Sequence, residues 1–235
     1  MSAGTQPFLA EAGELTKGAL ARERMLHAAL DVFGRHGFDG ATTRMLANRA
    51  SMNLGAIPYY FGSKEDLYAQ AADYLGRCMA KQLSPLLLKL SRSTAGEMNR
   101  ESLCDCVITF LIAQAKMFLH QDLPQTWMQF FLRVQGDRGP ALAHLHRHVI
   151  TPTEMALSPL IGRIIGCSSD ATTTKTLTFL ALHQTLHVQL TAASLVANTT
   201  WQAMTQAQTA SLLDTIGLAL RSQLMNFRAA PTSHP

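Results

Sequence analysis

The chain has 235 residues, of which 47% are hydrophobic and 15% charged, and its net charge is +4. This length can bury a substantial core and favours a small head with a larger body over one undivided domain. The modest charge excludes nucleic-acid binding driven by total charge alone. The first residues lack a basic segment followed by an apolar run, so we expect no secretory signal and a cytoplasmic location.

The first part of the chain predicts a short arm followed by a helix. Residues 1–16 are small and polar without periodicity, which indicates a disordered arm. Apolar residues then recur at helical spacing from Met25 to His36, and Gly37 follows. This pattern predicts an amphipathic helix that ends at Gly37.

Residues 42–67 predict two short helices joined by a tight turn. Thr42 or the threonine after it is a suitable N-cap for a first helix that ends near Ala50. Met52 would fill the angle between the helices, and Asn53, a strong N-cap residue, would start the second helix. This arrangement is typical of a DNA-binding helix-turn-helix.

Basic residues concentrate around this motif and carry the whole net charge of the chain. Between residues 16 and 64, seven basic residues stand against three acidic ones. The basic residues are Lys17, Arg22, Arg24, Arg35, Arg44, Arg49 and Lys64.

The rest of the chain predicts further helices. A helix should begin at Ser63, with acidic residues in its first turn, and Pro85 should kink it or end it within residues 82–90. Apolar spacing predicts later helices at 97–118, after Pro124 and at 141–165, the last with a bend at Pro152 or Pro159.

The segment from Thr176 to Leu213 contains no Asp, Glu, Lys or Arg, which predicts that something covers it. Polar residues such as His183, Gln184 and Gln189 interrupt any apolar run of membrane-spanning length. The two remaining explanations are a helix buried within the monomer and a helix packed against a second copy of the chain.

The order T-T-R-x-L-A-x-x-A, a hydrophobic turn residue, G-x-I and Y-F-x-S-K-E-x-L resembles the TetR family of bacterial transcriptional regulators, most closely over Leu20–Tyr74. The run A-I-P-Y-Y-F-G-S-K-E and the Pro152-Thr153 pair resemble the CecR-like branch of that family. The resemblance implies an all-α fold with an N-terminal three-helix head. After the arm, the head would span 17–65, and a ligand-binding and dimerisation body would span 66–230.

The resemblance also implies a dimer interface and a set of DNA contacts. Its last two long helices, here near 171–197 and 204–228, would form a four-helix interface with a second copy. Arg44 would contact a base or phosphate, and an arginine can pair bidentately with guanine. For each candidate, the alternative is an ordinary solvated or structural side chain. The candidate DNA-binding residues are Thr43, Arg44, Asn53, Leu54, Gly55, Ala56, Tyr59, Tyr60 and Lys64.

The head departs from the family pattern at three positions. Ser51 replaces a common turn glycine, and Asn53 replaces a common serine or threonine. Pro58 replaces a tyrosine that often contacts phosphate, and because it cannot donate a backbone hydrogen bond, the second helix should be short or kinked.

Two histidine pairs at i,i+4 spacing, His144/His148 and His183/His187, present imidazoles on one helical face each. No carboxylate or cysteine completes either pair, so we predict hydrogen-bonded structural histidines and no metal or cofactor. The four cysteines lack metal-binding spacing and are expected to be reduced. Motifs of hydrolases and of phosphate-binding loops are absent from the sequence, so we expect no enzymatic activity.

Aromatic and methionine residues between Met117 and Phe131 suit either core packing or a small-molecule pocket. With the family resemblance, they predict a ligand pocket formed by Met117, Trp127, Phe131, His148 and His183. The resulting prediction is a homodimeric repressor that binds a palindromic operator in double-stranded DNA and is released by a small molecule. Activation, regulation without a ligand, and a histidine-based metal enzyme are the alternatives.

Overall fold

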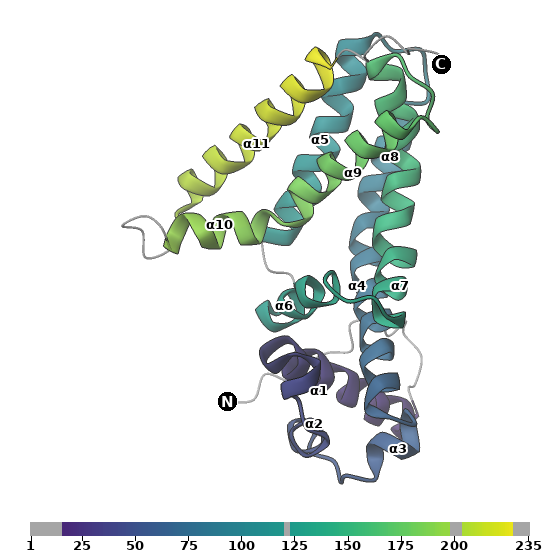
Figure 1. Ribbon diagram of the computed structural model, residues 1–235, viewed down its shortest axis with the longest axis vertical. Helices are drawn as coiled ribbons and strands as arrows, with labels where there is room; N and C mark the ends of the chain where they lie inside the picture. Colours follow the sequence, from purple (N-terminus) through teal and green to yellow (C-terminus); the bar gives the residue numbers. More distant parts are fainter. Residues whose placement is uncertain (1–15, 120–122, 198–203, 228–235) are drawn as a thin grey trace, which may run out of the picture. The chain divides into compact units, whose positions relative to one another are not determined.

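The computed structural model describes residues 16–119, 123–197 and 204–227, without the side chains of residues 189–191, 194 and 195. Every regular element in these ranges is a helix, which confirms the all-α prediction (Figure 1). Of the predicted arm, only Thr16 lies within the described residues.

The chain divides into two compact units, each built from two segments. Unit 1 comprises Met1–Lys81 and Leu123–Ile150, and unit 2 comprises Gln82–Asp122 and Thr151–Pro235. Helix α4 (Lys64–Ser93) contributes to both units.

Unit 1 contains the N-terminal helices together with a later segment of the chain. Besides the first part of α4, its elements are α1 (Lys17–Gly40), α2 (Thr43–Ala50), α3 (Ala56–Tyr60), α6 (Gln125–Val134), α7 (Pro140–Leu145) and the short π-helix η1 (His146–Ile150). The sequence did not predict that 123–150 would pack with the head.

Helix α1 has clear signals at both ends. The Thr16 hydroxyl accepts a hydrogen bond from the backbone N–H of Ala19 at 3.2 Å and so caps the helix start. Gly37 has φ +72° and ψ 179°, which breaks the regular helix where the sequence predicted its end. A single turn of helix follows to Gly40.

Aromatic rings form much of the core of unit 1. Phe33 of α1 is fully buried and meets the ring of Tyr68 edge-on at a centroid distance of 4.9 Å. Phe130 of α6 contacts Tyr68 in the same manner at 5.1 Å. The Tyr68 hydroxyl donates to Asp137 at 2.6 Å, and burial together with this bond raises the pKa of Tyr68. Three chain segments are thereby joined around one ring.

Helices α1 and α6 approach each other closely at Gly34. A Cβ atom at this position would lie 2.0 Å from the backbone oxygen of Thr126, so only glycine fits. Polar bonds hold the same contact: Thr126 Oγ1 donates to Asp31 at 2.6 Å, and Arg133 Nε donates to the Gly34 carbonyl at 2.9 Å.

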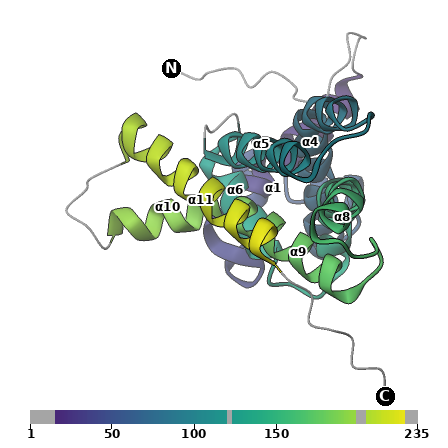
Figure 2. The same ribbon diagram turned by 90° about the horizontal axis from the view of Figure 1, so that it is seen from above.

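The described residues of unit 2 form the end of α4 and five further helices around an aliphatic core. These helices are α5 (Arg100–Leu119), α8 (Thr151–Ile165), α9 (Thr172–Leu186), α10 (Val188–Ala197) and α11 (Gln206–Asn226). Figure 2 shows the ribbons of α5, α8, α9 and α11 from above. These helices supply most of the buried residues, which include Leu111, Ile161 and Leu220.

Two predicted helices differ from the structure in their bounds. Helix α4 continues through Pro85 and ends at Ser93, so the predicted end within 82–90 was wrong. A proline removes one helical hydrogen bond, and here the rest of the helix outweighs that loss. The bend predicted at Pro152 or Pro159 stays a prediction, since both prolines lie within α8 and the π-helical segment η1 precedes that helix. The long helix predicted at 171–197 is interrupted at His187, whose imidazole bonds the same His183 carbonyl as its backbone N–H.

Within the described residues, α5 is the helix whose length and mean hydropathy, 1.6 over 18 residues, would suffice to cross a membrane. Buried helices of soluble proteins meet the same criteria, and 44% of this stretch is buried inside the protein. Gln114 in α5 is fully buried and accepts a hydrogen bond from Thr185 of α9 at 3.0 Å. These features fit a core helix.

Candidate DNA-binding surface

The first helix of the predicted helix-turn-helix forms as the sequence indicates. Thr42 is the N-cap of α2, and its hydroxyl accepts from the backbone N–H of Met45 at 3.2 Å. The helix ends at Ala50. Ser51 then takes left-handed dihedral angles, φ 55° and ψ 47°, which explains why a glycine would suit this turn.

The second helix begins later than predicted. Asn53 does not cap it; instead its carbonyl accepts from the backbone N–H of Ala56 at 3.1 Å, closing a turn. Helix α3 therefore spans five residues, Ala56–Tyr60. Pro58 is its third residue, where a backbone N–H has no partner within the helix, so the proline costs no hydrogen bond. The prediction of a short helix is confirmed, and that of the Asn53 cap is wrong.

The predicted contact residues differ in how far they can reach a ligand. Ala56 is only 6% exposed and packs inward, which leaves Leu54, at 52%, as the apolar side chain available near α3. Tyr59 is 79% exposed, while Tyr60 and Lys64 are partly buried. The exposed candidates are Thr43, Arg44, Asn53, Leu54, Gly55 and Tyr59.

Two arginines on α2 have different roles. Arg49 forms an ion pair with Asp31 of α1, whose other oxygen accepts from Thr126. Arg44 is exposed and makes no hydrogen bond or ion pair with any described residue. Arg44 is therefore available to bind a phosphate or a base edge, whereas Arg49 holds α2 against α1.

Aromatic rings hold two further cations near the motif. The Lys64 ammonium lies 4.3 Å from the centroid of the Phe38 ring, and the Arg22 guanidinium lies 5.1 Å from that of Phe61. At the start of α4, the Ser63 hydroxyl accepts from the Asp66 backbone N–H at 3.0 Å and donates to its carboxylate at 2.8 Å. Lys64 is thus positioned from both its helix and a neighbouring ring.

Sequence reasoning missed the residues that brace this surface from α6. Thr126 and Arg133 bond to α1, roughly one hundred positions earlier in the chain. Among the sequence features, only Gly34 within an otherwise regular helix signals this close approach, since a buried glycine in a helix often marks a neighbouring backbone.

The histidine pair of unit 1 surrounds a carboxylate. His144 Nδ1, Arg147 Nη2 and His148 Nε2 lie 3.1, 2.8 and 2.9 Å from Asp73 Oδ1, and Arg77 Nε lies 3.1 Å from its other oxygen. Burial would raise the pKa of Asp73, but the hydrogen bond from His148 and the nearby positive charges together lower it. This cluster fixes η1 on α4.

The histidine pair of unit 2 bonds to its own helix. His183 Nδ1 lies 2.9 Å from the Phe179 carbonyl, and His187 Nδ1 lies 3.0 Å from the His183 carbonyl. The His183 ring also stacks on Phe179 at a centroid distance of 3.6 Å. The described residues contain no group of three or more side chains arranged to hold a metal.

The predicted pocket residues lie in both units. Trp127, Phe131 and His148 belong to unit 1, whereas Met117 and His183 belong to unit 2. None of them is among the residues that line three cavities of unit 2, so this pocket stays a prediction.

The cysteines are free thiols. Cys78 is fully buried, and burial raises its pKa to about 12, so its thiol is protonated and unreactive at neutral pH. Burial also raises the pKa of Cys104.

Two family models match the chain. Residues 25–71 match the model of bacterial regulatory proteins of the tetR family. Residues 100–227 match the C-terminal domain of the HTH-type transcriptional dual regulator CecR. CecR of Shigella flexneri is 30% identical over 201 residues, which cover 85% of this chain and 89% of that protein. The nicotine-responsive repressor HdnoR of Paenarthrobacter nicotinovorans is 26% identical over 60% of this chain and 66% of its own length.

Solved structures share the fold. A TetR-family regulator from Mesorhizobium loti superposes with a TM-score of 0.55 at 14% identity, over 92% of this chain and all of that one. FadR of Bacillus subtilis in complex with stearoyl-CoA gives a TM-score of 0.54 at 12% identity, over 85% and 97% of the two chains. By its motif, its fold and these matches, the chain belongs to the TetR family of bacterial transcriptional regulators and has a CecR-type C-terminal domain.

Proposed function

We propose that this regulator is a cytoplasmic homodimeric repressor that binds a palindromic operator and is released by a small molecule, without enzymatic activity. The observation that carries the proposal is the contrast between two arginines of α2: Arg44 is exposed and has no partner among the described residues, whereas Arg49 is paired with Asp31. Two-fold symmetric dimers bind palindromic sites because each copy contacts one half-site.

Within the head, residues 17–65, the candidate contacts fall into two groups. Arg44, Asn53, Leu54, Gly55 and Tyr59 lie on the exposed side of the motif and would approach base edges. Thr43, Tyr60 and Lys64 would bind phosphates and fix the orientation of the head.

Dimerisation through the body, residues 66–230, is supported by the surface of α9 and α11. Leu180 on α9 and Leu218 on α11 are exposed large apolar residues, and residues 176–213 contain no Asp, Glu, Lys or Arg. An exposed apolar surface of this kind marks a contact with another protein surface. A second copy of the chain is the partner that the family implies.

A ligand response is supported by the family relatives. HdnoR is named as nicotine-responsive, and the FadR structure contains stearoyl-CoA. In this chain α4 begins in the head and ends in unit 2, so it is the element through which ligand binding would change the affinity for DNA. CecR is named a dual regulator, so activation at some promoters is the second candidate function.

Selection of DNA from genomic fragments tests the proposal. Purified protein would be mixed with sheared genomic DNA at near-physiological salt, and the retained fragments would be sequenced. Enrichment of one short palindrome is expected, with sedimentation of the complex showing two chains per site. Retention without sequence preference would contradict a specific regulator, since salt-dependent phosphate contacts alone give such binding.

A further inference from the structure

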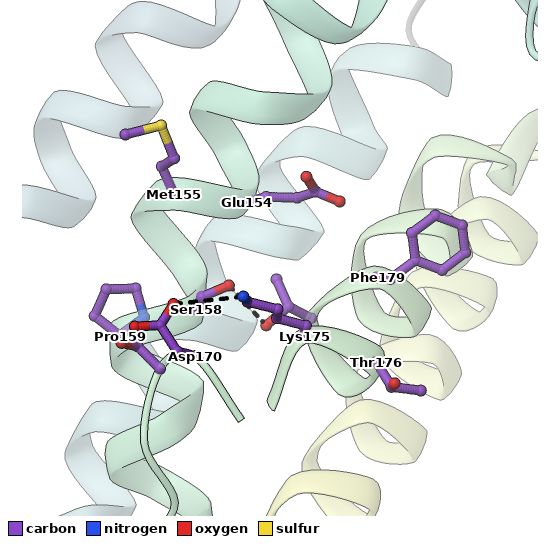
Figure 3. A pocket seen from close by; sticks show the side chains of 10 residues that line it. Glu154, Met155, Ser158, Pro159, Asp170, Lys175, Thr176 and Phe179 are labelled. Atoms are coloured by element: carbon purple, nitrogen blue, oxygen red, sulfur yellow. Dashed lines mark hydrogen bonds and ion pairs between the residues drawn. The ribbon is translucent and has the colours of Figure 1, made fainter. Parts of the chain in front are cut away.

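Unit 2 contains a pocket of about 640 Å³ between α8, α9 and the loop that joins them. A cavity of this size suits a small organic molecule. Its walls combine charged, hydroxyl and apolar side chains (Figure 3). The lining residues are Glu154, Met155, Ser158, Pro159, Ser169, Asp170, Lys175, Thr176, Thr178 and Phe179.

Much of the polar lining already has partners within the protein. The Ser158 hydroxyl of α8 donates to Thr178 of α9 at 3.3 Å, and Thr178 donates to the Thr174 carbonyl at 2.8 Å. The Lys175 ammonium lies 3.4 Å from Asp170. These bonds join the two helices and pair the one basic side chain of the pocket with an acidic one.

Glu154 is the charged lining residue of this pocket that has no partner among the described residues. Its partly buried carboxylate makes no hydrogen bond or ion pair with any described residue, and it extends from α8 toward the wall formed by α9 (Figure 3). The pocket thus carries two carboxylates and one ammonium, a net charge of one negative. Glu154 would repel an anionic ligand, which could pair with Lys175 only by separating it from Asp170. A cationic ligand could pair with Glu154 and leave that ion pair intact.

The apolar part of the pocket suits the body of such a ligand. Phe179 is 46% exposed, with its ring stacked on His183, and Met155 and Pro159 are also exposed. Because His183 covers one face of the Phe179 ring, an organic cation would contact the other face, and Glu154 of the same pocket would balance its charge. We propose that this pocket binds a monocationic organic amine with an apolar or aromatic body, with Glu154 as its charge partner.

This inference deepens the ligand response proposed above, but its test needs no DNA. Isothermal titration of the full-length protein would compare three probes of similar size: 4-phenylbutylamine, 4-phenylbutan-1-ol and 4-phenylbutanoate. The amine is expected to bind most tightly and the carboxylate least. Equal binding of all three, or binding of none, would overturn the proposal. Failure of the amine to release operator DNA would instead count against its role in regulation.

Two variants locate the site. Glu154→Gln keeps the shape of the side chain and should weaken amine binding about fivefold while leaving the alcohol unchanged. Phe179→Leu should weaken amine binding about threefold. Asp214→Asn, which removes an exposed carboxylate of α11 outside the pocket, is the matched control and should have no effect. Equal amine affinity of wild type and Glu154→Gln would overturn the site. A Glu154→Gln variant that changes the dimer dissociation constant and leaves amine affinity unchanged would also overturn it, and would assign the pocket to contact with a second copy of the chain.

Discussion

The two units of this protein are held together by different kinds of side chain. Unit 1 is held by aromatic rings and by side chains that bond to distant backbone or to charged groups, as at Tyr68, Asp73 and Arg133. Unit 2 is held mainly by aliphatic side chains, and its residues 176–213 contain no Asp, Glu, Lys or Arg. The difference fits the proposed function, in which the head must be held rigidly to bind DNA and the body would contact a second copy of the chain.

The close contact between α1 and α6 is the strictest feature of unit 1. Gly34→Ala would force a methyl group onto the Thr126 carbonyl, so we expect a loss of about 3 kcal/mol in the free energy of unfolding, measured by urea denaturation. Gly18→Ala in the same helix is the control, because its methyl would meet nothing closer than 4.0 Å and alanine favours helix. Equal effects of the two substitutions would show that α6 does not brace α1.

In unit 2, Arg100 offers the corresponding polar anchor. Its guanidinium donates to the carbonyls of Ile164 in α8 and, at 2.9 Å, Met225 in α11. Arg100→Met should lower the free energy of unfolding by about 1 kcal/mol. Lys116→Met, at an exposed position of the same helix, should change it by less than about 0.5 kcal/mol. If Arg100→Met left the free energy of unfolding unchanged, unit 2 would depend on its apolar core alone.

The pH dependence of stability would further distinguish unit 1 from unit 2. Burial lowers the pKa of His27 more than the nearby carboxylates of Glu23 and Asp31 raise it. The Tyr74 hydroxyl donates its proton to Glu23, so the neutral His27 ring donates to the Tyr74 oxygen at 2.7 Å. The His27 imidazole therefore binds a proton more readily in the unfolded chain. Its contribution to the free energy of unfolding is fully present above about pH 6.5 and is lost as the pH falls below that value. We expect a loss of up to about 1 kcal/mol between pH 7.5 and 5.5.

His27→Gln, which keeps a donor, should flatten this pH dependence. Asp73 has the opposite sign: because its pKa is lowered, its contribution is present above about pH 4 and is lost only at lower pH, outside this window. Identical pH profiles of wild type and His27→Gln would remove His27 as the cause.

The smallest expected effect concerns the turn of the helix-turn-helix. Ser51→Gly should stabilise the protein by about 0.5–1 kcal/mol, because Ser51 has left-handed dihedral angles that glycine adopts without strain. Ser51→Ala should give no gain, since alanine has the same conformational cost. Thermal denaturation measures both, and a gain with alanine would assign the effect to the hydroxyl.

The sequence predicted the helix-turn-helix well because its signals are local. Thr42 caps α2, Gly37 breaks α1 and Pro58 accompanies a short α3 within a few positions of each feature. The prediction that Asn53 caps the second helix was wrong because asparagine also favours turns, and here its carbonyl closes a turn.

The parts that sequence patterns could not predict depend on distant contacts. The bonds of Thr126 and Arg133 to α1, and the gathering of His144 and His148 around Asp73, join positions about 70 to 100 residues apart. The same limit explains why the pocket at Glu154 was not predicted, since its walls come from α8 and α9 and match no motif.

The most direct test of the account compares Arg44→Ala with Arg49→Ala on the selected palindrome and on a scrambled sequence, each at two salt concentrations. If Arg44 contacts a base, its loss should cost about 1–3 kcal/mol on the palindrome and little on the scrambled DNA. Arg49→Ala should change both sequences alike and only slightly, because Arg49 is paired with Asp31. Equal losses on both sequences for Arg44→Ala, or a larger loss of selectivity for Arg49→Ala, would contradict the assignment of Arg44 as the base contact.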